Sequence, residues 1–321
     1  MNKVILLSAL KNLAKEIIYV YLTLMKIMIP VVLVVKALEL LGAIQWLAAL
    51  LSPVMVLVGL PDTMGIVWAT TMATNIYAGM VVFYEVAANE TLTVAQISIL
   101  GVMMLLAHGL PVEVAIAKKA GVRVRATLLL RIGGALLLGV ILNYCYQTFG
   151  LLQRPSEAIW QPSIADSSLS LWLLEQLKTY VMIFIIIAVL ITLLKILRLI
   201  GVERLMHWLM SPLLKLLGIS KSASNTTIIG ITLGLSFGGA LLIDEARSGR
   251  LSQRDVFISL GFLALCHSLI EDTLLVMMLG ADIYTVLWIR LIFSLVVLTV
   301  IARCIYTSDT SKFKKYLMNN R

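Results

Sequence analysis

Two stretches of the chain each place a histidine and an acid five positions apart inside an apolar segment. His108 precedes Glu113, and His267 precedes Asp272 in a second stretch that lies 159 positions later. Ionisable side chains at membrane depth are costly, so they usually face a polar cavity or one another. Imidazole and carboxylate groups can bind a solute, carry a proton or coordinate a cation. Gly109 lies inside the first stretch, and we interpret both stretches as breaks in the middle of helices.

Composition places these segments in a membrane. The mean hydropathy is +1.00, and 60% of the residues are hydrophobic while 13% are charged. A soluble domain carries about 25% charged residues. We therefore predict a helical integral membrane protein, because backbone polar groups in lipid must be satisfied within the element. The net charge of +9 then reflects basic cytoplasmic loops in contact with the bilayer, and it does not indicate nucleic-acid binding.

The chain is an internal repeat. Shifting it by 159 positions aligns residues 20–147 with the second half without a gap. Identical pairs are Tyr21 and Tyr180, Lys36 and Lys195, Gly42 and Gly201, Gly59 and Gly218, Gly79 and Gly238, Gly121 and Gly280, and Arg131 and Arg290. The shared offset predicts two copies of one structural unit.

The basic residues of the two copies lie on opposite connections. One connection of the first copy holds Lys118, Lys119, Arg123 and Arg125, and the partner positions in the second copy have no basic residue. One connection of the second copy holds Arg247, Arg250 and Arg254, and its partner connection in the first copy has no basic residue. Under the positive-inside rule, this exchange predicts that the copies have inverted topology. The predicted fold is an all-α integral membrane protein of two inverted repeats, about 17–147 and 176–306. Each repeat has three spans, an interfacial helix and a re-entrant helical hairpin.

These expectations divide the chain as follows. An amphipathic lead-in (1–16) precedes the first transmembrane repeat (17–149), an extracytoplasmic linker (150–170), the inverted second repeat (171–306) and a basic cytoplasmic tail (307–321). Both termini are then cytoplasmic, in a multi-pass protein of the inner (plasma) membrane. We expect Pro30 to kink the first span.

The segments 63–87 and 222–246 allow two interpretations. Each is long enough to cross the membrane once, but each has a small and polar middle. Such residues favour close packing of crossing helices, or the tip of a re-entrant hairpin that lines a wet cavity. The hairpin gives three crossings per copy, and an inverted repeat needs an odd number.

The order of span, interfacial helix, hairpin, broken span and span resembles the core of the concentrative nucleoside transporters. More generally it resembles the nucleoside recognition, or Gate, domain family, which also includes ferrous-iron permeases and sporulation membrane proteins. In the nucleoside transporters, both hairpin tips and both broken helices line the substrate site. The resemblance implies a substrate site formed by Thr70, Thr71, Thr74, Asn75, His108, Gly234, Ser236, Phe237, Gly238 and His267. Its ion-coupling residues would be Glu113, Glu271 and Asp272.

Several of these residues have simpler alternatives. His108 and His267 can hold helices together through backbone hydrogen bonds instead of handling solute or protons. Glu113 and Asp272 can hold a cation or carry a proton, whereas neutralisation of Glu113 by Lys118 or its neighbour is the structural alternative. Arg131 and its repeat partner Arg290 are expected to snorkel to the membrane interface.

The leading functional hypothesis is a secondary transporter of a small polar, nucleoside-like solute. It would work by alternating access, coupled to Na⁺ or H⁺ and without another cofactor. Alternatives are a divalent-metal permease, or a non-transporting scaffold that is part of a larger complex. We find no nucleotide-binding loop or nucleophile–base pair, so an enzyme is not expected. Carriers of this architecture are often oligomeric, so the alternatives for the assembly are a homo-oligomer and a monomer.

Overall fold

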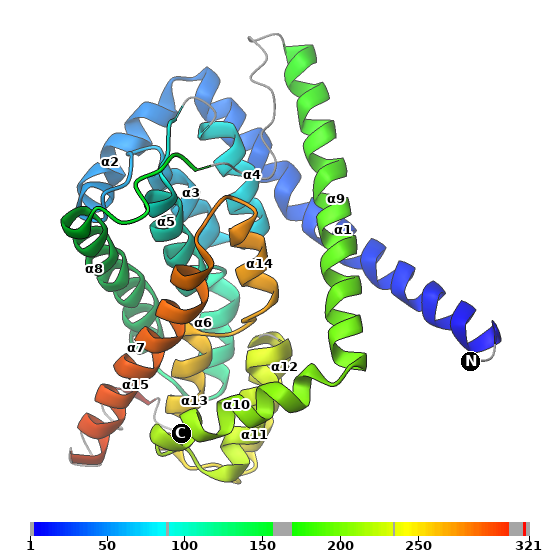
Figure 1. Ribbon diagram of the computed structural model, residues 1–321, viewed down its shortest axis with the longest axis vertical. Helices are drawn as coiled ribbons and strands as arrows, with labels where there is room; N and C mark the ends of the chain where they lie inside the picture. Colours follow the sequence, from blue (N-terminus) through cyan, green and yellow to red (C-terminus); the bar gives the residue numbers. More distant parts are fainter. Residues whose placement is uncertain (1–2, 88–89, 157–168, 234, 308–316, 319–321) are drawn as a thin grey trace.

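The computed structural model describes residues 3–87, 90–156, 169–233, 235–307 and 317–318 (Figure 1). These residues form helices and the loops between them. Five of the helical segments are long and apolar enough to cross a membrane: 10–40, 94–119, 124–149, 169–199 and 284–305. The expectation of an all-α membrane protein is confirmed. The segment 255–279, which contains the second predicted break, is divided between two shorter helices and is not among these five.

The described residues of the first half form eight α-helices and one π-helical segment. They are α1 (Lys3–Leu40), α2 (Ala43–Leu57), α3 (Met64–Ala73), α4 (Ile76–Val86), α5 (Val94–Ala107), α6 (Leu110–Lys119), α7 (Val124–Leu128), η1 (Leu129–Gly133) and α8 (Gly134–Phe149). The second half contains α9 (Leu169–Leu199), α10 (Val202–Leu216), α11 (Lys221–Leu233), α12 (Leu235–Arg247), α13 (Gln253–Leu265), α14 (Glu271–Met277), η2 (Tyr284–Ile289) and α15 (Arg290–Thr307).

Helix boundaries recur at the offset of 159 positions. The pairs α2 and α10, α4 and α12, and α5 and α13 begin at positions related by that offset. Glycines with positive φ recur in the same way: Gly42 with Gly201, Gly59 with Gly218, and Gly121 with Gly280. The sequence repeat is therefore accompanied by a repeat of helix ends and turns.

The segment 63–87 forms a hairpin of two short helices rather than one crossing helix. At about 1.5 Å per residue, α3 and α4 are each roughly 15 Å long, half the thickness of a bilayer core. Gly79 of α4 lies against the side chain of Thr71 in α3, so the helices touch where a larger residue would not fit. The partner hairpin of α11 and α12 closes in the same way, with Gly238 against the backbone of Gly230.

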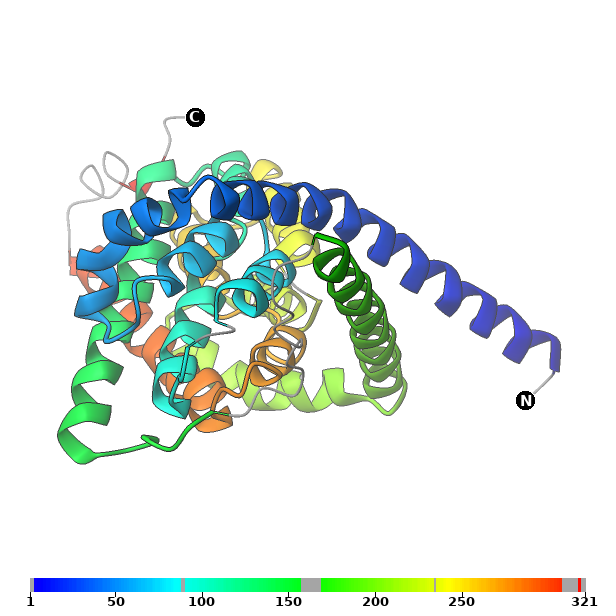
Figure 2. The same ribbon diagram turned by 90° about the horizontal axis from the view of Figure 1, so that it is seen from above.

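Helices α1 and α9 lie at one side of the molecule (Figures 1 and 2). Tyr21 of α1 donates a hydrogen bond to the carbonyl oxygen of Tyr180 in α9 (3.4 Å), and these are repeat-related positions. The lead-in and the first span are one continuous helix that starts at Lys3 and passes through Pro30, not two elements that meet at residue 17. The N-terminal end of this helix projects away from the other helices (Figure 2).

The buried centre of the molecule is α5. Thirteen of its residues are buried, among them Leu100 and Met104. The capping box of Thr93 and Gln96 starts this helix by satisfying its first amide groups. Because α5 contacts α3, α8, α13 and α14, its C-terminal end is held at the middle of the structure.

Candidate functional site

Both predicted helix breaks are present. Helix α5 ends at Ala107 and α6 begins at Leu110, with Gly109 between them at φ 57°. Helix α13 ends at Leu265 and α14 begins at Glu271, and here Ser268 has φ 45°. Left-handed backbone is uncommon for a residue with a side chain, and it is concentrated at functional sites.

Each break is held by the neighbouring hairpin. The amide of Gly109 donates to the carbonyl oxygen of Thr71 in α3 (3.0 Å). The amide of Leu269 donates to the carbonyl oxygen of Ile231 in α11 (3.3 Å). Amide groups freed by the breaks thus find partners, as a buried backbone requires.

The hydrogen bonds of the two histidines fix their tautomers. His108 Nδ1 lies 3.1 Å from the carbonyl oxygen of Met104, and His267 Nδ1 lies 2.7 Å from that of Leu263. A carbonyl oxygen can only accept, so each Nδ1 carries the proton that it donates. The Nε2 atom of each neutral imidazole then presents a lone pair.

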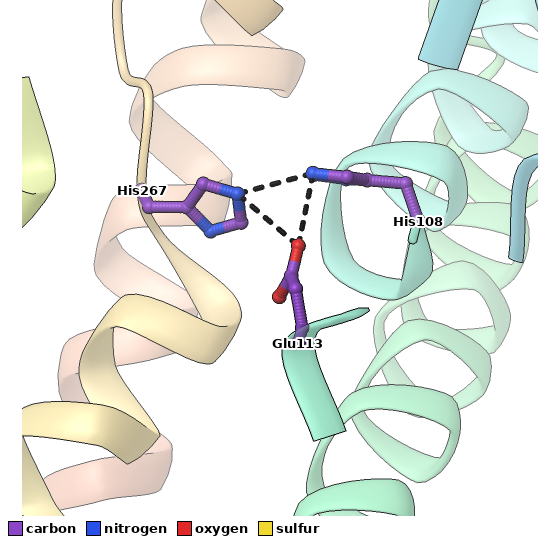
Figure 3. Close-up of side chains that lie close together, drawn as sticks. All are labelled: His108, Glu113 and His267. Atoms are coloured by element: carbon purple, nitrogen blue, oxygen red, sulfur yellow. Dashed lines mark hydrogen bonds and ion pairs between the residues drawn. The ribbon is translucent and has the colours of Figure 1, made fainter. Parts of the chain in front are cut away.

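The two lone pairs and a carboxylate converge (Figure 3). His108 Nε2 lies 3.0 Å from His267 Nε2. Glu113 Oε1 lies 3.2 Å from the former nitrogen and 3.4 Å from the latter. None of the described residues donates a hydrogen bond to these three atoms, and all three side chains are buried. Three hydrogen-bond acceptors at such distances repel one another unless a proton or a metal cation lies between them.

Asp272 lies at the edge of this cluster. Its Oδ2 is 3.8 Å from His108 Nε2 and 3.9 Å from His267 Nε2. This oxygen is buried and has no hydrogen-bond partner among the described residues. Glu271 points elsewhere and accepts a hydrogen bond from the hydroxyl of Tyr77 (3.3 Å). Of the three predicted ion-coupling residues, Glu113 and Asp272 therefore join the histidines, and Glu271 does not.

Two buried arginines lie next to the cluster. The expectation that they snorkel to the membrane interface is wrong. Arg131 and Arg290 are 0% exposed, so they do not snorkel to the interface. Arg131 Nη2 donates to the carbonyl oxygen of His108 (2.8 Å), and Arg290 Nη2 donates to that of His267 (2.8 Å). The helix breaks explain this placement, because each leaves carbonyl groups at a helix C-terminus that a cation stabilises.

Arg131 also forms an ion pair with Glu113 through Nη1. Glu113 is therefore paired with Arg131, and not with Lys118 or its neighbour as the structural alternative expected. Arg131 lies in η1, and Arg290 directly follows η2. Such π-helical insertions often accompany functional sites. The equal spacing of each arginine from its histidine, 23 positions, is a sequence signal that could have identified this support.

The predicted residues of the first hairpin lie at its tip. The Thr71 and Thr74 hydroxyls donate to the carbonyl oxygens of Val67 (2.8 Å) and Thr70 (2.6 Å). Asn75 caps α4 by accepting from the amide of Ala78. These hydrogen bonds lie within the hairpin, and its tip contacts the helix break through the carbonyl oxygen of Thr71.

The second hairpin is described in part. Gly234 lies outside the described residues, and for Ser236 and Phe237 the structure describes the helix α12 but not the side chains. Gly238 is occupied by its contact with Gly230, which gives it a packing role.

A cavity of about 420 Å³ is lined by residues of α1, α4, α9, α10, α11 and α14. Tyr77, Thr232 and Glu271 line it near the hairpins, and Glu16 and Lys195 line it further out. The last two form an ion pair of 2.8 Å. A volume of this size suits a small polar molecule.

The chain is similar to the uncharacterized membrane protein YvoD of Bacillus subtilis. The two are 31% identical over 279 residues, which covers 84% of this chain and 86% of the relative. No family model and no solved structure matches the chain.

Proposed function

Since the chain belongs to the family of the membrane protein YvoD, we propose that it is a membrane transporter with a central cation site. It moves a small polar solute by alternating access, and the cation binds between its two halves. The observation that carries this proposal is the convergence of His108 Nε2, His267 Nε2 and Glu113 Oε1 without a hydrogen-bond donor. Buried acceptors that face one another are stabilised by a proton or a metal cation bound between them.

The repeat gives the mechanism its geometry. His108 contacts His267, and Tyr21 contacts Tyr180, so repeat-related residues meet at two places. Such self-pairing is expected on a two-fold axis between inverted repeats. Transporters of that design rock one repeat against the other around a site at the midplane, built from broken helices.

The orientation follows from the basic residues. Arg123 bonds to the backbone of Leu317 and Met318 near the C-terminus. Helices α10 to α13 lie at the same end of the molecule (Figure 1). This end carries the loops rich in lysine and arginine, and we assign it to the cytoplasm of a bacterial inner membrane. The hairpins α3–α4 and α11–α12 then enter the membrane from opposite sides.

The solute would bind in the cavity beside the cation site. Tyr77 and Glu271 offer a hydroxyl and a carboxylate at its inner end, and the hydroxyl of Thr232 lies nearby. The volume and these polar groups suit a solute of nucleoside size. The cation site and the solute site share α14, because Glu271 and Asp272 are adjacent. Binding of one ligand would therefore change the position of groups that bind the other.

The test is uptake by purified protein in proteoliposomes. Radiolabelled nucleosides, nucleobases, amino acids and dipeptides would be offered with a cation gradient and without one. We expect one solute class to accumulate in a gradient-dependent manner, and His267→Ala to abolish this accumulation. His207→Ala is the matched control, because this third histidine lies on α10 and bonds only to Asn225 and Ser211 among the described residues.

A divalent-metal permease is the second candidate, since the same acceptor cluster suits a metal ion as cargo. Metal uptake without any accompanying solute would favour it. Vesicles that accumulate neither solutes nor metals would favour a scaffold and contradict both transport functions.

A further inference from the structure

We infer that His108, His267, Glu113 and Asp272 form a tetrahedral site for a first-row divalent transition metal of the Zn²⁺ type. Three ligand atoms already converge, Nε2 of both histidines and Oε1 of Glu113. Oδ2 of Asp272, outside this group, is the candidate for the fourth position. This inference deepens the proposed function by naming the cation, and it rests on the same cluster.

The spacing of the ligand atoms matches a metal coordination sphere. Metal–nitrogen bonds of about 2.0–2.1 Å place tetrahedral ligands about 3.3 Å apart. The three measured separations are 3.0, 3.2 and 3.4 Å. A metal ion about 2 Å from all three atoms would lie slightly out of their plane, on the open side that a fourth ligand must occupy.

Asp272 is suited to be that fourth ligand. Its Oδ2 is 3.8 and 3.9 Å from the two nitrogens, about 0.5 Å beyond a tetrahedral edge. Because Asp272 is not among the three converging side chains, it would have to move toward them to bind the metal. The oxygen is buried, and no described residue bonds to it, so a metal would satisfy an atom that otherwise loses its hydration without compensation.

The donor set selects the class of metal. Two imidazoles with carboxylates suit Zn²⁺, Co²⁺, Fe²⁺ and Mn²⁺, whereas Ca²⁺ and Mg²⁺ prefer oxygen alone and Cu⁺ prefers sulfur. Cys266, the neighbour of His267, is not part of the convergent group. The short separations of the three converging atoms favour Zn²⁺ and Co²⁺ among these ions.

An outer layer of contacts orients the ligands. Each histidine donates its Nδ1 proton to a backbone carbonyl, the usual arrangement at metal-bound imidazoles. Arg131 holds the second oxygen of Glu113 and the carbonyl oxygen of His108. The positive charges of Arg131 and Arg290 weaken the attraction for a dication. A moderate affinity suits an ion that must leave the site during transport.

The experiment is titration of the purified full-length protein in detergent with Co²⁺ and Zn²⁺. Isothermal calorimetry would measure stoichiometry, and the visible absorption of Co²⁺ would report its geometry. We expect one ion per chain with the intense bands of tetrahedral Co²⁺, displaced by Zn²⁺. Losing even an outer-layer partner lowers metal affinity by about 10- to 100-fold, so His108→Ala and His267→Ala should each lower it at least that much.

His207→Ala should bind Co²⁺ like the wild type, because this histidine lies outside the cluster. Thermal unfolding in detergent would establish that the alanine variants remain folded. If a histidine variant does not fold, Asp272→Asn would be titrated with Co²⁺ instead. We expect its Co²⁺ absorption bands to be shifted and weakened relative to those of the wild type.

Absence of stoichiometric binding to the wild-type protein would overturn the metal site, as would binding that both histidine variants retain. Uptake assays separate this failure from failure of the transporter. Solute accumulation that persists in the presence of a chelator would contradict the metal site but would still support the transport function. Stoichiometric Co²⁺ binding without uptake of any solute or metal would support the metal site but contradict the transport function.

Discussion

The two helix breaks have the same plan but differ in how firmly their acid is held. In the first break, Glu113 reaches both histidines and is paired with Arg131. In the second, Asp272 has one methylene fewer and stays 3.8 to 3.9 Å from the same nitrogens. Its Oδ2 has no hydrogen-bond partner among the described residues. The repeat thus supplies two acids to one site, and only one of them is fixed in place.

This difference shows how an internal repeat can become functionally asymmetric. A site made of two identical halves would hold its cation equally from both sides. Here the first half presents a preorganised carboxylate, and the second half presents one that must move to bind. If access alternates around the site, Asp272 of α14, whose Oδ2 has no hydrogen-bond partner among the described residues, is the group whose position can differ between the two states.

The largest effect is expected from the arginines. Arg131→Met leaves both the Glu113 carboxylate and a helix-end carbonyl without their cation in a buried region. Breaking a buried ion pair in this way costs about 3–5 kcal/mol. Arg290→Met removes donors to the carbonyl oxygens of Leu265 and His267 but no ion pair among the described residues, and should cost about 1–3 kcal/mol. Thermal unfolding in detergent would rank the two variants.

Equal destabilisation by the two substitutions would contradict the proposed asymmetry. The double variant Arg131→Met with Glu113→Gln sharpens the comparison. It removes both charges of the pair, and it should be more stable than Arg131→Met alone. Arg250→Met is a surface control, because its ion pair with Asp244 is exposed and should contribute less than about 1 kcal/mol.

The next effect distinguishes the two acids by length. Glu113→Asp withdraws the fixed ligand by one methylene and should weaken Co²⁺ binding by about 10- to 100-fold, or about 1.4–2.7 kcal/mol. Asp272→Glu extends the other acid toward the metal and should leave affinity unchanged or increase it. Calorimetric titration of both variants measures the contrast. Equal losses would mean that the two acids hold the cation in the same way.

The sequence predicted the helical membrane class, both breaks and the hairpin interpretation of 63–87. Those features follow from local composition: apolar runs of helix length, and small or polar residues that interrupt them. The repeat offset also identified His108 and His267 as a pair. What could not be predicted is which partner each charge finds. Arg131 follows Glu113 by 18 positions and lies beside it only because η1 packs against α5 and α13.

The backbone of the two breaks should respond differently to substitution. Gly109→Ala places a side chain where φ is 57°, and its Cβ would lie 3.4 Å from the carbonyl oxygen of Thr74, so we expect a loss of about 1 kcal/mol. Ser268→Gly relieves a left-handed residue and should change stability by less than about 1 kcal/mol. Paired thermal unfolding curves provide the measurement. A larger loss for Ser268→Gly would indicate that the serine hydroxyl has a role beyond backbone geometry.

The smallest effect concerns the cavity, where the two halves differ most in residue type. Glu271 corresponds to Val112 in the first repeat, so the hydrogen bond from Tyr77 exists in one half of the molecule only. Tyr77→Phe removes that bond and should cost about 0.5–1.5 kcal/mol. Tyr84→Phe is the matched control on the same helix, because its buried hydroxyl has no hydrogen-bond partner among the described residues and its loss should be neutral or stabilising.

If the cavity receives the solute, Tyr77→Phe should also raise KM for uptake while Co²⁺ affinity stays unchanged. A shift in Co²⁺ affinity with normal KM would instead connect Tyr77 to the cation site.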